Sequence, residues 1–268
     1  ITGTSIPETY VTAMRSSIVV LSALLGRMGE GRSCYPGGCL IGARPIDLHL
    51  MALQALGAEI KEHDGLIEAR CRDAQGLKGT EIHLPYPSVG ATEQAILASV
   101  LAKEVTVIHG AAKEPEISQL CRFLNNMGAV ICGMGTDHLM IQGVEELHDS
   151  SFRVEGDRIV AGTYAAAVMA AMGSITLKEV RAAELELPLE MLKRSGASIQ
   201  KDSCGRQIRI EMKKRPLPLD IKTGPYPEFP TDLQSPYMAF LASGQGTSTI
   251  VEQVFEGRFA TAKALVQM

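Results

Sequence analysis

The chain has 268 residues, of which 46% are hydrophobic and 21% are charged, a balance typical of soluble globular proteins with about two domains. Its net charge of −4 offers no broad basic surface, so we expect no nucleic-acid partner. No apolar run reaches the roughly 18 residues that span a bilayer, and no signal peptide is apparent, so we expect no membrane partner.

Six cysteines are scattered along the chain: Cys34, Cys39, Cys71, Cys121, Cys132 and Cys204. None forms a CxxC pair, and no Cys/His cluster has the spacing of a zinc site, so the sequence predicts no metal and no cofactor. Scattered thiols in a chain of this size are typical of a reducing compartment, which favours the cytoplasm.

Four apolar segments rich in small residues predict helices at residues 14–29, 90–105, 162–175 and 231–246. A strand, a loop and an amphipathic helix follow each of the first three. The glycines Gly57, Gly128 and Gly196 then stand where those amphipathic helices end, at spacings of 71 and 68 residues. Glycine suits a helix C-cap because a positive φ costs it nothing.

This period of about 70 residues predicts an α/β fold made of compact units, each with two helices and a small sheet of its own. Chance similarity among helix C-caps is the alternative. A further Gly-Ala pair would fall just beyond Met268, so we expect the chain to end inside a unit and to be a piece of a longer protein.

The most informative segment is CYPGGCLIGARPIDLHL, residues 34–50. The turn Pro36-Gly37-Gly38 precedes Cys39, and Arg44 follows five residues later. A thiol flanked by glycines and followed by a cation predicts a mobile loop that carries a reactive thiolate and binds an anion. An inert structural thiol is the alternative.

The segment PGGCLIGARPIDLHL resembles the signature of the UDP-N-acetylglucosamine enolpyruvyl transferases, or 1-carboxyvinyltransferases. Further similar segments follow in family order: MRSSI (14–18), PSVGAT (87–92), AAKEPEI (111–117), DRIVAGTY (157–164), FPTDLQ (229–234) and VFEGRF (254–259). The resemblance implies a two-domain inside-out α/β barrel of six similar units, incomplete in this chain. We expect a catalytic-loop domain at 1–156 and a second domain at 157–268.

The implied reaction transfers the enolpyruvyl group of phosphoenolpyruvate to the 3-hydroxyl of UDP-N-acetylglucosamine, the first committed step of peptidoglycan synthesis. The resemblance makes Cys39 the general acid and the thiol that fosfomycin alkylates. It makes Asp232 the base at the sugar hydroxyl, and Arg44 a ligand of substrate phosphate groups. A base at the hydroxyl and an acid at carbon are what addition to a vinyl group requires.

The resemblance also implies a set of substrate-binding residues. Arg15 would lie at the nucleotide-sugar site, and Arg258 matches a family arginine. The residues expected to border the nucleotide are Arg44, Pro45, Ile46, Asp47, Leu48, Tyr86 and Pro87. The residues expected to contact the diphosphate and the sugar are Ser88, Val89 and Gly90, through a helix N-terminus, and Val254, through its backbone.

Several of these residues have a structural alternative. Asp232 and Ser88 each precede an apolar helix and could be its N-cap. Arg15 could be a solvated charge in the first turn of its helix, and His49 an ordinary surface histidine. Glu114 lies just before a helix, where an acidic side chain favours the helix dipole.

Two other functions compete with the transferase. Enolpyruvylshikimate phosphate synthase shares the fold, but its family lacks the PGGC loop. A truncated, non-catalytic paralogue that binds a UDP-sugar or a partner protein is the other alternative, because the family's N-terminal Lys-Asn pair and late arginine are absent from these residues. The sequence leaves the oligomeric state open.

Overall fold

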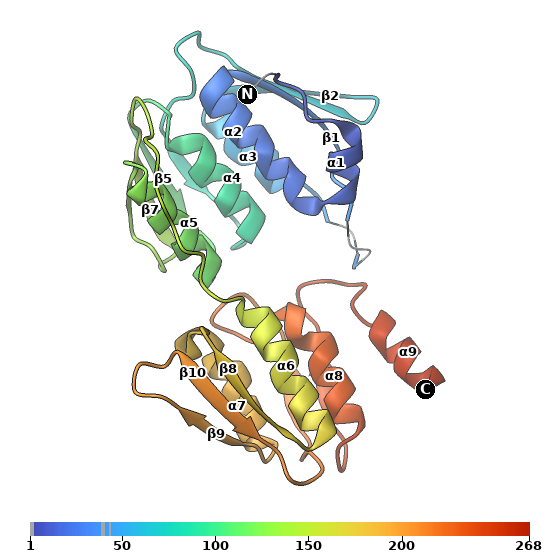
Figure 1. The fold of residues 1–268 in the computed structure, drawn as a ribbon. Coiled ribbons are helices and arrows are strands. Elements are labelled where there is room, and N and C mark those ends of the chain that lie inside the picture. The colour runs from blue at the N-terminus through green and yellow to red at the C-terminus, as the bar shows by residue number, and fades with distance from the viewer. Residues whose placement is uncertain (1–2, 39–40, 43) are drawn as a thin grey trace. The chain divides into compact units, whose positions relative to one another are not determined.

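The computed structural model describes residues 3–38, 41–42 and 44–268, which form two compact units (Figure 1). Unit 1 comprises the described residues up to 38 and residues 44–152. Unit 2 comprises residues 41–42 and 153–268. Both units combine helices with small sheets, which confirms the α/β class.

A pattern of helix, strand, helix and β-hairpin occurs three times. The first copy contains α2 (Val20–Met28), β1 (Glu30–Cys34), α3 (Asp47–Ala55), β2 (Ala58–His63) and β3 (Leu66–Cys71). The second contains α4 (Val89–Ser99), β5 (Val105–His109), α5 (Pro115–Asn126), β6 (Val130–Cys132) and β7 (His138–Gln142). The third contains α6 (Arg158–Ala171), β8 (Ser174–Lys178), α7 (Glu186–Arg194), β9 (Ser198–Lys201) and β10 (Gln207–Glu211). The copies begin 69 residues apart each time, which confirms the repeat.

The remaining elements precede, link or follow these copies. They are α1 (Glu8–Ala13), η1 (Arg15–Val19), β4 (Glu81–His83), η2 (Ala182–Leu185), β11 (Asp220–Lys222), η3 (Thr231–Leu233), α8 (Gln234–Ala242), β12 (Thr249–Val251) and α9 (Ala260–Gln267).

The strands pair in the same way in every copy. The strand after the first helix lies antiparallel to the last strand of the hairpin, which gives the orders β1-β3-β2, β5-β7-β6 and β8-β10-β9. Strand β4 extends the second sheet by pairing parallel with β5, and β11 pairs parallel with β12. Along the strands buried and exposed side chains alternate, so one face of each sheet packs on helices and the other faces solvent.

The three aligned glycines are helix C-caps, as the sequence predicts. Gly57, Gly128 and Gly196 follow α3, α5 and α7 with φ values of +94°, +99° and +109°. Each donates its backbone N–H to a carbonyl in the last turn of its helix. The left-handed conformation turns the chain from each helix into the strand that follows.

Each unit has its own hydrophobic core. In unit 1, α2 and α3 both pack against α4, and the core consists of aliphatic side chains. In unit 2, α6 packs against α8, and the core includes the aromatic cluster of Phe229, Tyr237 and Phe240. The Tyr237 hydroxyl donates to the carbonyl of Pro188 at 2.9 Å, so its polar group is satisfied although the side chain is fully buried.

The four predicted apolar helices are present, with different bounds. Residues 14–29 form η1 and α2, and residues 231–246 contain η3 and α8. Helix α4 ends at Ser99 because β5 already begins at Val105. Helix α6 begins at Arg158, where the Asp157 carboxylate accepts two backbone N–H groups of the first turn. Among the described helices, none has both the length and the apolar character needed to cross a bilayer.

Candidate functional site

Two arginines lie close together where η1 meets the turn that leads into α3. Nη2 of Arg15 donates to the carbonyl oxygen of Pro45 at 3.0 Å, and the Arg15 side chain is half-buried rather than freely solvated. Burial, and then the positive charge of Arg44, lower the pKa of Arg15. Two guanidinium groups placed near each other favour the binding of an anion, so this corner of unit 1 suits a phosphate or a carboxylate.

The two glycines before Cys39 lie in close contact with the backbone of α1 and η1. A Cβ on Gly37 would lie 1.8 Å from the carbonyl oxygen of Thr12, and the Gly37 N–H donates to the carbonyl of Val11 at 3.1 Å. Gly38 has a φ of +107° and lies against the backbone of Arg15. Two consecutive glycines are therefore required so that the chain can pass α1 at Gly37 and η1 at Gly38. Cys39 itself lies outside the described residues.

The predicted nucleotide-binding residues 45–48 have two kinds of environment. Pro45 and Asp47 are exposed, and Asp47 opens α3, where its carboxylate favours the helix dipole. The Ile46 side chain is only 4% exposed and belongs to the core, and Leu48 packs partly against the same core. Ile46 can reach a ligand only through its backbone.

His49 is buried, so its interpretation as a surface histidine is wrong. Burial lowers its pKa to about 4, although the neighbouring Gln94 opposes this shift, and the imidazole is neutral at pH 7. Its ring lies against α4, where a Cβ on Gly90 would approach His49 Cε1 to 2.7 Å. Glycine at position 90 therefore lets the first turns of α3 and α4 lie side by side.

The N-terminus of α4 adds backbone donors to this corner. Ser88 is the N-cap, as one alternative proposed, and its Oγ accepts the N–H of Ala91 at 3.3 Å. Helix geometry leaves the first N–H groups, including those of Val89 and Gly90, without acceptors inside the helix. Two adjacent helix N-termini and two arginines give this end of unit 1 a positive potential that suits an anion. Tyr86 and Pro87 precede the cap, and Tyr86 is exposed.

In unit 2, the predicted base is paired with a predicted binding residue. Nη2 of Arg258 contacts Oδ1 of Asp232 in a short ion pair. Asp232 lies in η3 and makes no capping bond to α8, so the N-cap alternative for Asp232 is wrong. The Arg258 side chain is 14% exposed, stacks over the ring of Phe255 and leaves its Nε without a hydrogen-bond partner. The pair thus presents an exposed carboxylate beside a buried cation.

The loop that contains Val254 is held by Glu252. One carboxylate oxygen of Glu252 accepts the N–H groups of Val254 and Phe255 at 2.8 and 3.1 Å, and the other accepts the hydroxyl of Thr231 at 2.9 Å. Because the Val254 N–H is occupied, its carbonyl oxygen is the backbone group left for a ligand. Farther along this loop, Gly257 donates to the carbonyl of Ile41 at 3.0 Å.

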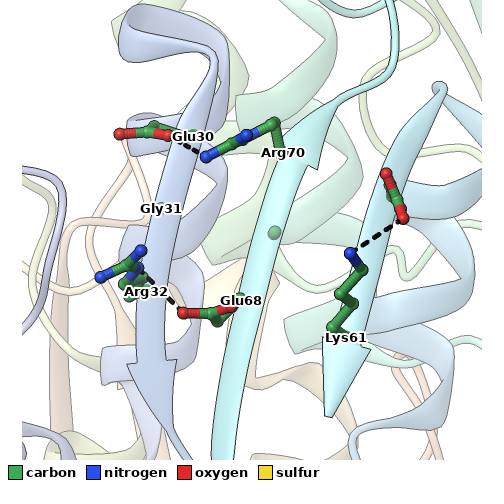
Figure 2. Close-up of a pocket in the computed structure, with 8 residues that line it drawn as sticks. Glu30, Gly31, Arg32, Lys61, Glu68 and Arg70 are labelled. Carbon is green, nitrogen blue, oxygen red and sulfur yellow. Dashed lines mark hydrogen bonds and ion pairs between the residues drawn. The ribbon is translucent and has the colours of Figure 1, made fainter.

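A shallow charged depression on the outer face of the β1-β3-β2 sheet is a different feature (Figure 2). Arg32 pairs with Glu68 at 3.0 Å, and Arg70 pairs with Glu30 at 3.1 Å, each directly across the two strands. Such exposed pairs contribute about 0.2–1 kcal/mol to stability. Because Arg32 and Arg70 each pair with a glutamate, the depression is poorly suited to binding an anion.

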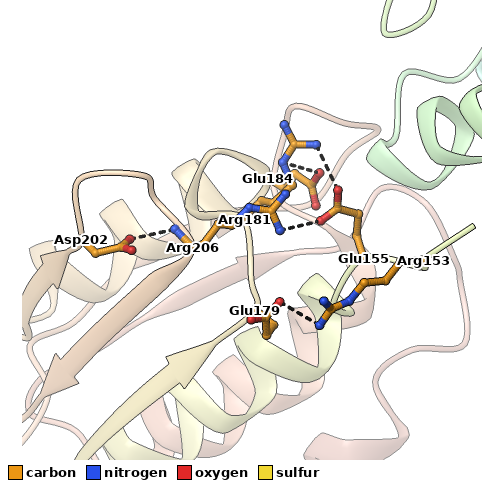
Figure 3. A network of polar contacts seen from close by, with 7 residues as sticks. All are labelled: Arg153, Glu155, Glu179, Arg181, Glu184, Asp202 and Arg206. Atoms are coloured by element: carbon orange, nitrogen blue, oxygen red, sulfur yellow. Dashed lines mark hydrogen bonds and ion pairs between the residues drawn. The ribbon is translucent and has the colours of Figure 1, made fainter.

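A second charged network fixes the segment that leads into α6 (Figure 3). The carboxylate oxygens of Glu155 lie 3.2 Å from Nη1 of Arg206 and 3.8 Å from Nη1 of Arg181. Nη2 of Arg153 lies 3.2 Å from Oε2 of Glu179. These contacts join the start of the third repeat to the loops of its own sheet. Their role is structural, because each charge has an opposite partner within the network.

Sequence reasoning missed two residues that shape these sites. Glu252 positions the Val254 loop, and no local pattern distinguishes it from a surface glutamate. His49 fixes the contact between α3 and α4, and its position one helical turn before the core residue Leu53 was the signal that could have identified it as buried.

Comparison with known proteins agrees with these observations. A UDP-N-acetylglucosamine 1-carboxyvinyltransferase of Zymomonas mobilis is 47% identical over all 268 residues, and one of Sphingopyxis alaskensis is 44% identical. The chain spans 62% of the length of both relatives. These relatives confirm the resemblance drawn from the PGGC segment.

The crystal structure of the enolpyruvyl transferase NikO from Streptomyces tendae matches the fold with a TM-score of 0.81 at 20% identity, over 98% of this chain and 62% of that one. An EPSP synthase of Acinetobacter baumannii matches with a TM-score of 0.57 at 20% identity, over 88% of this chain and 54% of that one. The family model described as EPSP synthase (3-phosphoshikimate 1-carboxyvinyltransferase) matches residues 2–268. The chain therefore belongs to the EPSP synthase (3-phosphoshikimate 1-carboxyvinyltransferase) family and has the enolpyruvyl transferase fold.

Proposed function

We propose that this chain supplies binding and catalytic residues of a UDP-N-acetylglucosamine 1-carboxyvinyltransferase. The observation that carries the proposal is the meeting of Arg15, Arg44 and the N-termini of α3 and α4 in one corner of unit 1. UDP-N-acetylglucosamine has a diphosphate, and phosphoenolpyruvate has a phosphate and a carboxylate. Arginines and helix N-termini are the groups that bind such anions.

The binding roles follow from where each group lies. The N–H groups of Val89 and Gly90 hold the diphosphate, with Ser88 fixing the helix start, and the arginines neutralise its charge. The exposed residues Pro45, Asp47 and Tyr86 and the half-buried Pro87 border the uridine, together with the backbone of Ile46 and Leu48. In unit 2, the carbonyl of Val254 contacts the sugar, and Arg258 holds the carboxylate of Asp232.

The reaction needs one base and one acid. Asp232 accepts the proton of the sugar 3-hydroxyl while the hydroxyl oxygen of the sugar bonds to C2 of phosphoenolpyruvate. Cys39 donates a proton to the methylene carbon. The resulting tetrahedral intermediate then loses inorganic phosphate and a proton from the new methyl group, which leaves the enolpyruvyl ether. This is the first committed step of peptidoglycan synthesis, and we propose a cytoplasmic location on that basis.

Calorimetric titration with UDP-N-acetylglucosamine tests the binding site. We expect Arg44→Ala and Arg15→Ala each to weaken binding about 10- to 100-fold, because a hydrogen bond to a charged group contributes about 1.5–3 kcal/mol. Arg70→Ala, which removes a cation of the β1-β3 face, is the matched control. Equal affinity of the Arg44 and Arg70 variants would contradict the assignment of the site.

The chemistry is tested by mass spectrometry of the sugar nucleotide and by release of inorganic phosphate. We expect product formation that is lost in Cys39→Ala and in Asp232→Asn but kept in Cys132→Ala, which removes an exposed thiol. With UDP-N-acetylglucosamine present, fosfomycin should add once, at Cys39. An adduct spread over several thiols, or turnover by Cys39→Ala, would refute the role of Cys39.

A further inference from the structure

Three histidines form a row across three adjacent strands of the second sheet. The β-register places His83 of β4 opposite His109 of β5, and His109 opposite His138 of β7. Neighbouring strand residues such as Ile108 are buried, so the imidazoles project from the opposite, outer face. Figure 1 shows β5 and β7 side by side in unit 1. None of these residues has a role in the proposed transferase.

A carboxylate completes the cluster from the same face of β4. Oε2 of Glu81 lies 3.5 Å from Nε2 of His83 and 3.7 Å from Nε2 of His109. One ligand atom from each of these three residues lies within 4.8 Å of the others. Around a tetrahedral zinc ion, with bonds of about 2.0–2.1 Å, neighbouring ligand atoms are about 3.3 Å apart. The observed separations from Glu81 exceed that value by only a few tenths of an ångström.

The central histidine, His109, has a ring nitrogen without a hydrogen-bond partner. Nε2 of His109 is shielded from solvent and makes no hydrogen bond. The rings of His83 and His109 stack with centroids 4.4 Å apart and planes 4° from parallel. A metal ion would bond this nitrogen directly, once rotation of the two rings about their Cβ–Cγ bonds turns their lone pairs, which lie in nearly parallel planes, toward a common point.

His138 and Asp137 support the central ring from the other side. The His138 ring meets His109 edge to face, with centroids 5.0 Å apart, and its Nδ1 lies 2.7 Å from Oδ1 of Asp137. Asp137 thus orients the His138 ring, and His138 restrains the His109 ring by direct contact.

We propose that Glu81, His83 and His109 bind a divalent transition-metal ion, with zinc as the best match to two imidazole nitrogens and one carboxylate oxygen. Water fills the fourth position. The ion links β4, an edge strand of three residues, to β5 through side chains in addition to their backbone pairing. The role is to brace the edge of this sheet, separately from the anion-binding corner.

The test is calorimetric titration of the metal-free, reduced chain with zinc. We expect one high-affinity zinc ion per chain and at least tenfold weaker binding in His83→Ala and in Glu81→Gln. Both positions are exposed, and Glu81→Gln keeps the side-chain size, so the fold is preserved. His63→Ala is the matched control, because it removes an exposed histidine from a different sheet of the same unit.

X-ray absorption of the zinc-loaded chain separates this site from the exposed thiols of Cys132 and Cys204. Ligands at about 2.0–2.1 Å with no sulfur are expected, since a thiolate would lie at about 2.3 Å. Zinc should also raise the melting temperature of the wild-type chain and not that of His83→Ala. Equal affinity of the His83 and His63 variants, or sulfur in the zinc shell, would overturn the proposal.

Discussion

Glu93 on α4 should make the stability of this protein depend on pH. Burial, and then the negative charge of Glu116 on α5, raise the pKa of the Glu93 carboxyl from 4.5 to about 7. The folded state therefore holds this proton more tightly than the unfolded state. The stability that this proton contributes is fully present below pH 4.5. It is lost as the pH rises through about 7, because the folded protein must then bury a charged carboxylate.

The size of the effect follows from that shift. At about 1.36 kcal/mol per pKa unit, the full loss across the window is about 3 kcal/mol, and about 2.5 kcal/mol of it falls between pH 5 and pH 8. Glu93→Gln keeps the shape and cannot ionise, so it does not lose this contribution. We expect the free energy of unfolding of the variant to gain about 2–3 kcal/mol on that of the wild type as the pH rises from 5 to 8.

Urea unfolding of both proteins at pH 5, 6, 7 and 8 measures this difference. Glu145→Gln, which changes an exposed glutamate of the same unit, controls for net charge and should show no such trend. Carboxyl NMR of Glu93 gives the titration directly. A difference between Glu93→Gln and wild type that stays constant with pH would refute the reasoning.

Substitutions at three positions test the sites. Gly90→Ala should cost about 1–3 kcal/mol in urea unfolding, because its Cβ would clash with the His49 ring; an unchanged stability would contradict the close approach of α3 and α4. Ser88→Ala should lower the free energy of unfolding by about 1 kcal/mol in the same assay, because it removes the side chain that caps α4. Ser88→Asp keeps a capping oxygen and should lower it much less. Equal losses in the two variants would contradict the capping role of Ser88. Asp232→Asn should abolish enolpyruvyl transfer, measured as phosphate release. It should change the free energy of unfolding by less than about 1 kcal/mol, because Asp232 is the exposed member of its pair with Arg258. Wild-type turnover by this variant would exclude Asp232 as the base.

The repeat and the helices were predictable because they depend on local patterns. Apolar periodicity marks the central helices, and the glycines that end α3, α5 and α7 have the positive φ that their positions require. The bounds were not predictable to the residue. Helix α6 ends at Ala171 because β8 must begin at Ser174, opposite Glu211 of β10, and such a long-range pairing leaves no local mark in the sequence.

The candidate sites were also predictable only in part from the sequence. The resemblance predicts roles for Arg15, Arg44 and Asp232, but it does not predict that Asp232 pairs with Arg258 or that Ile46 belongs to the core. The histidine cluster was invisible to a search for metal-ligand spacing. His83 and His109 are 26 residues apart in the sequence, and strand pairing alone brings them together.

The low aromatic content of the chain bears on how the anion site of unit 1 forms. With aromatic residues at 4%, the helices of unit 1 fill the core with alanine and aliphatic side chains, which allows helix axes to approach closely. At Gly90 the absence of a side chain brings α4 against the His49 ring of α3, so both helices begin at the same corner. The positive ends of two helix dipoles then coincide, and η1 adds Arg15 beside Arg44. A bulkier packing layer would separate those N-termini, so the small residues that fill the core also concentrate positive potential at this corner of unit 1.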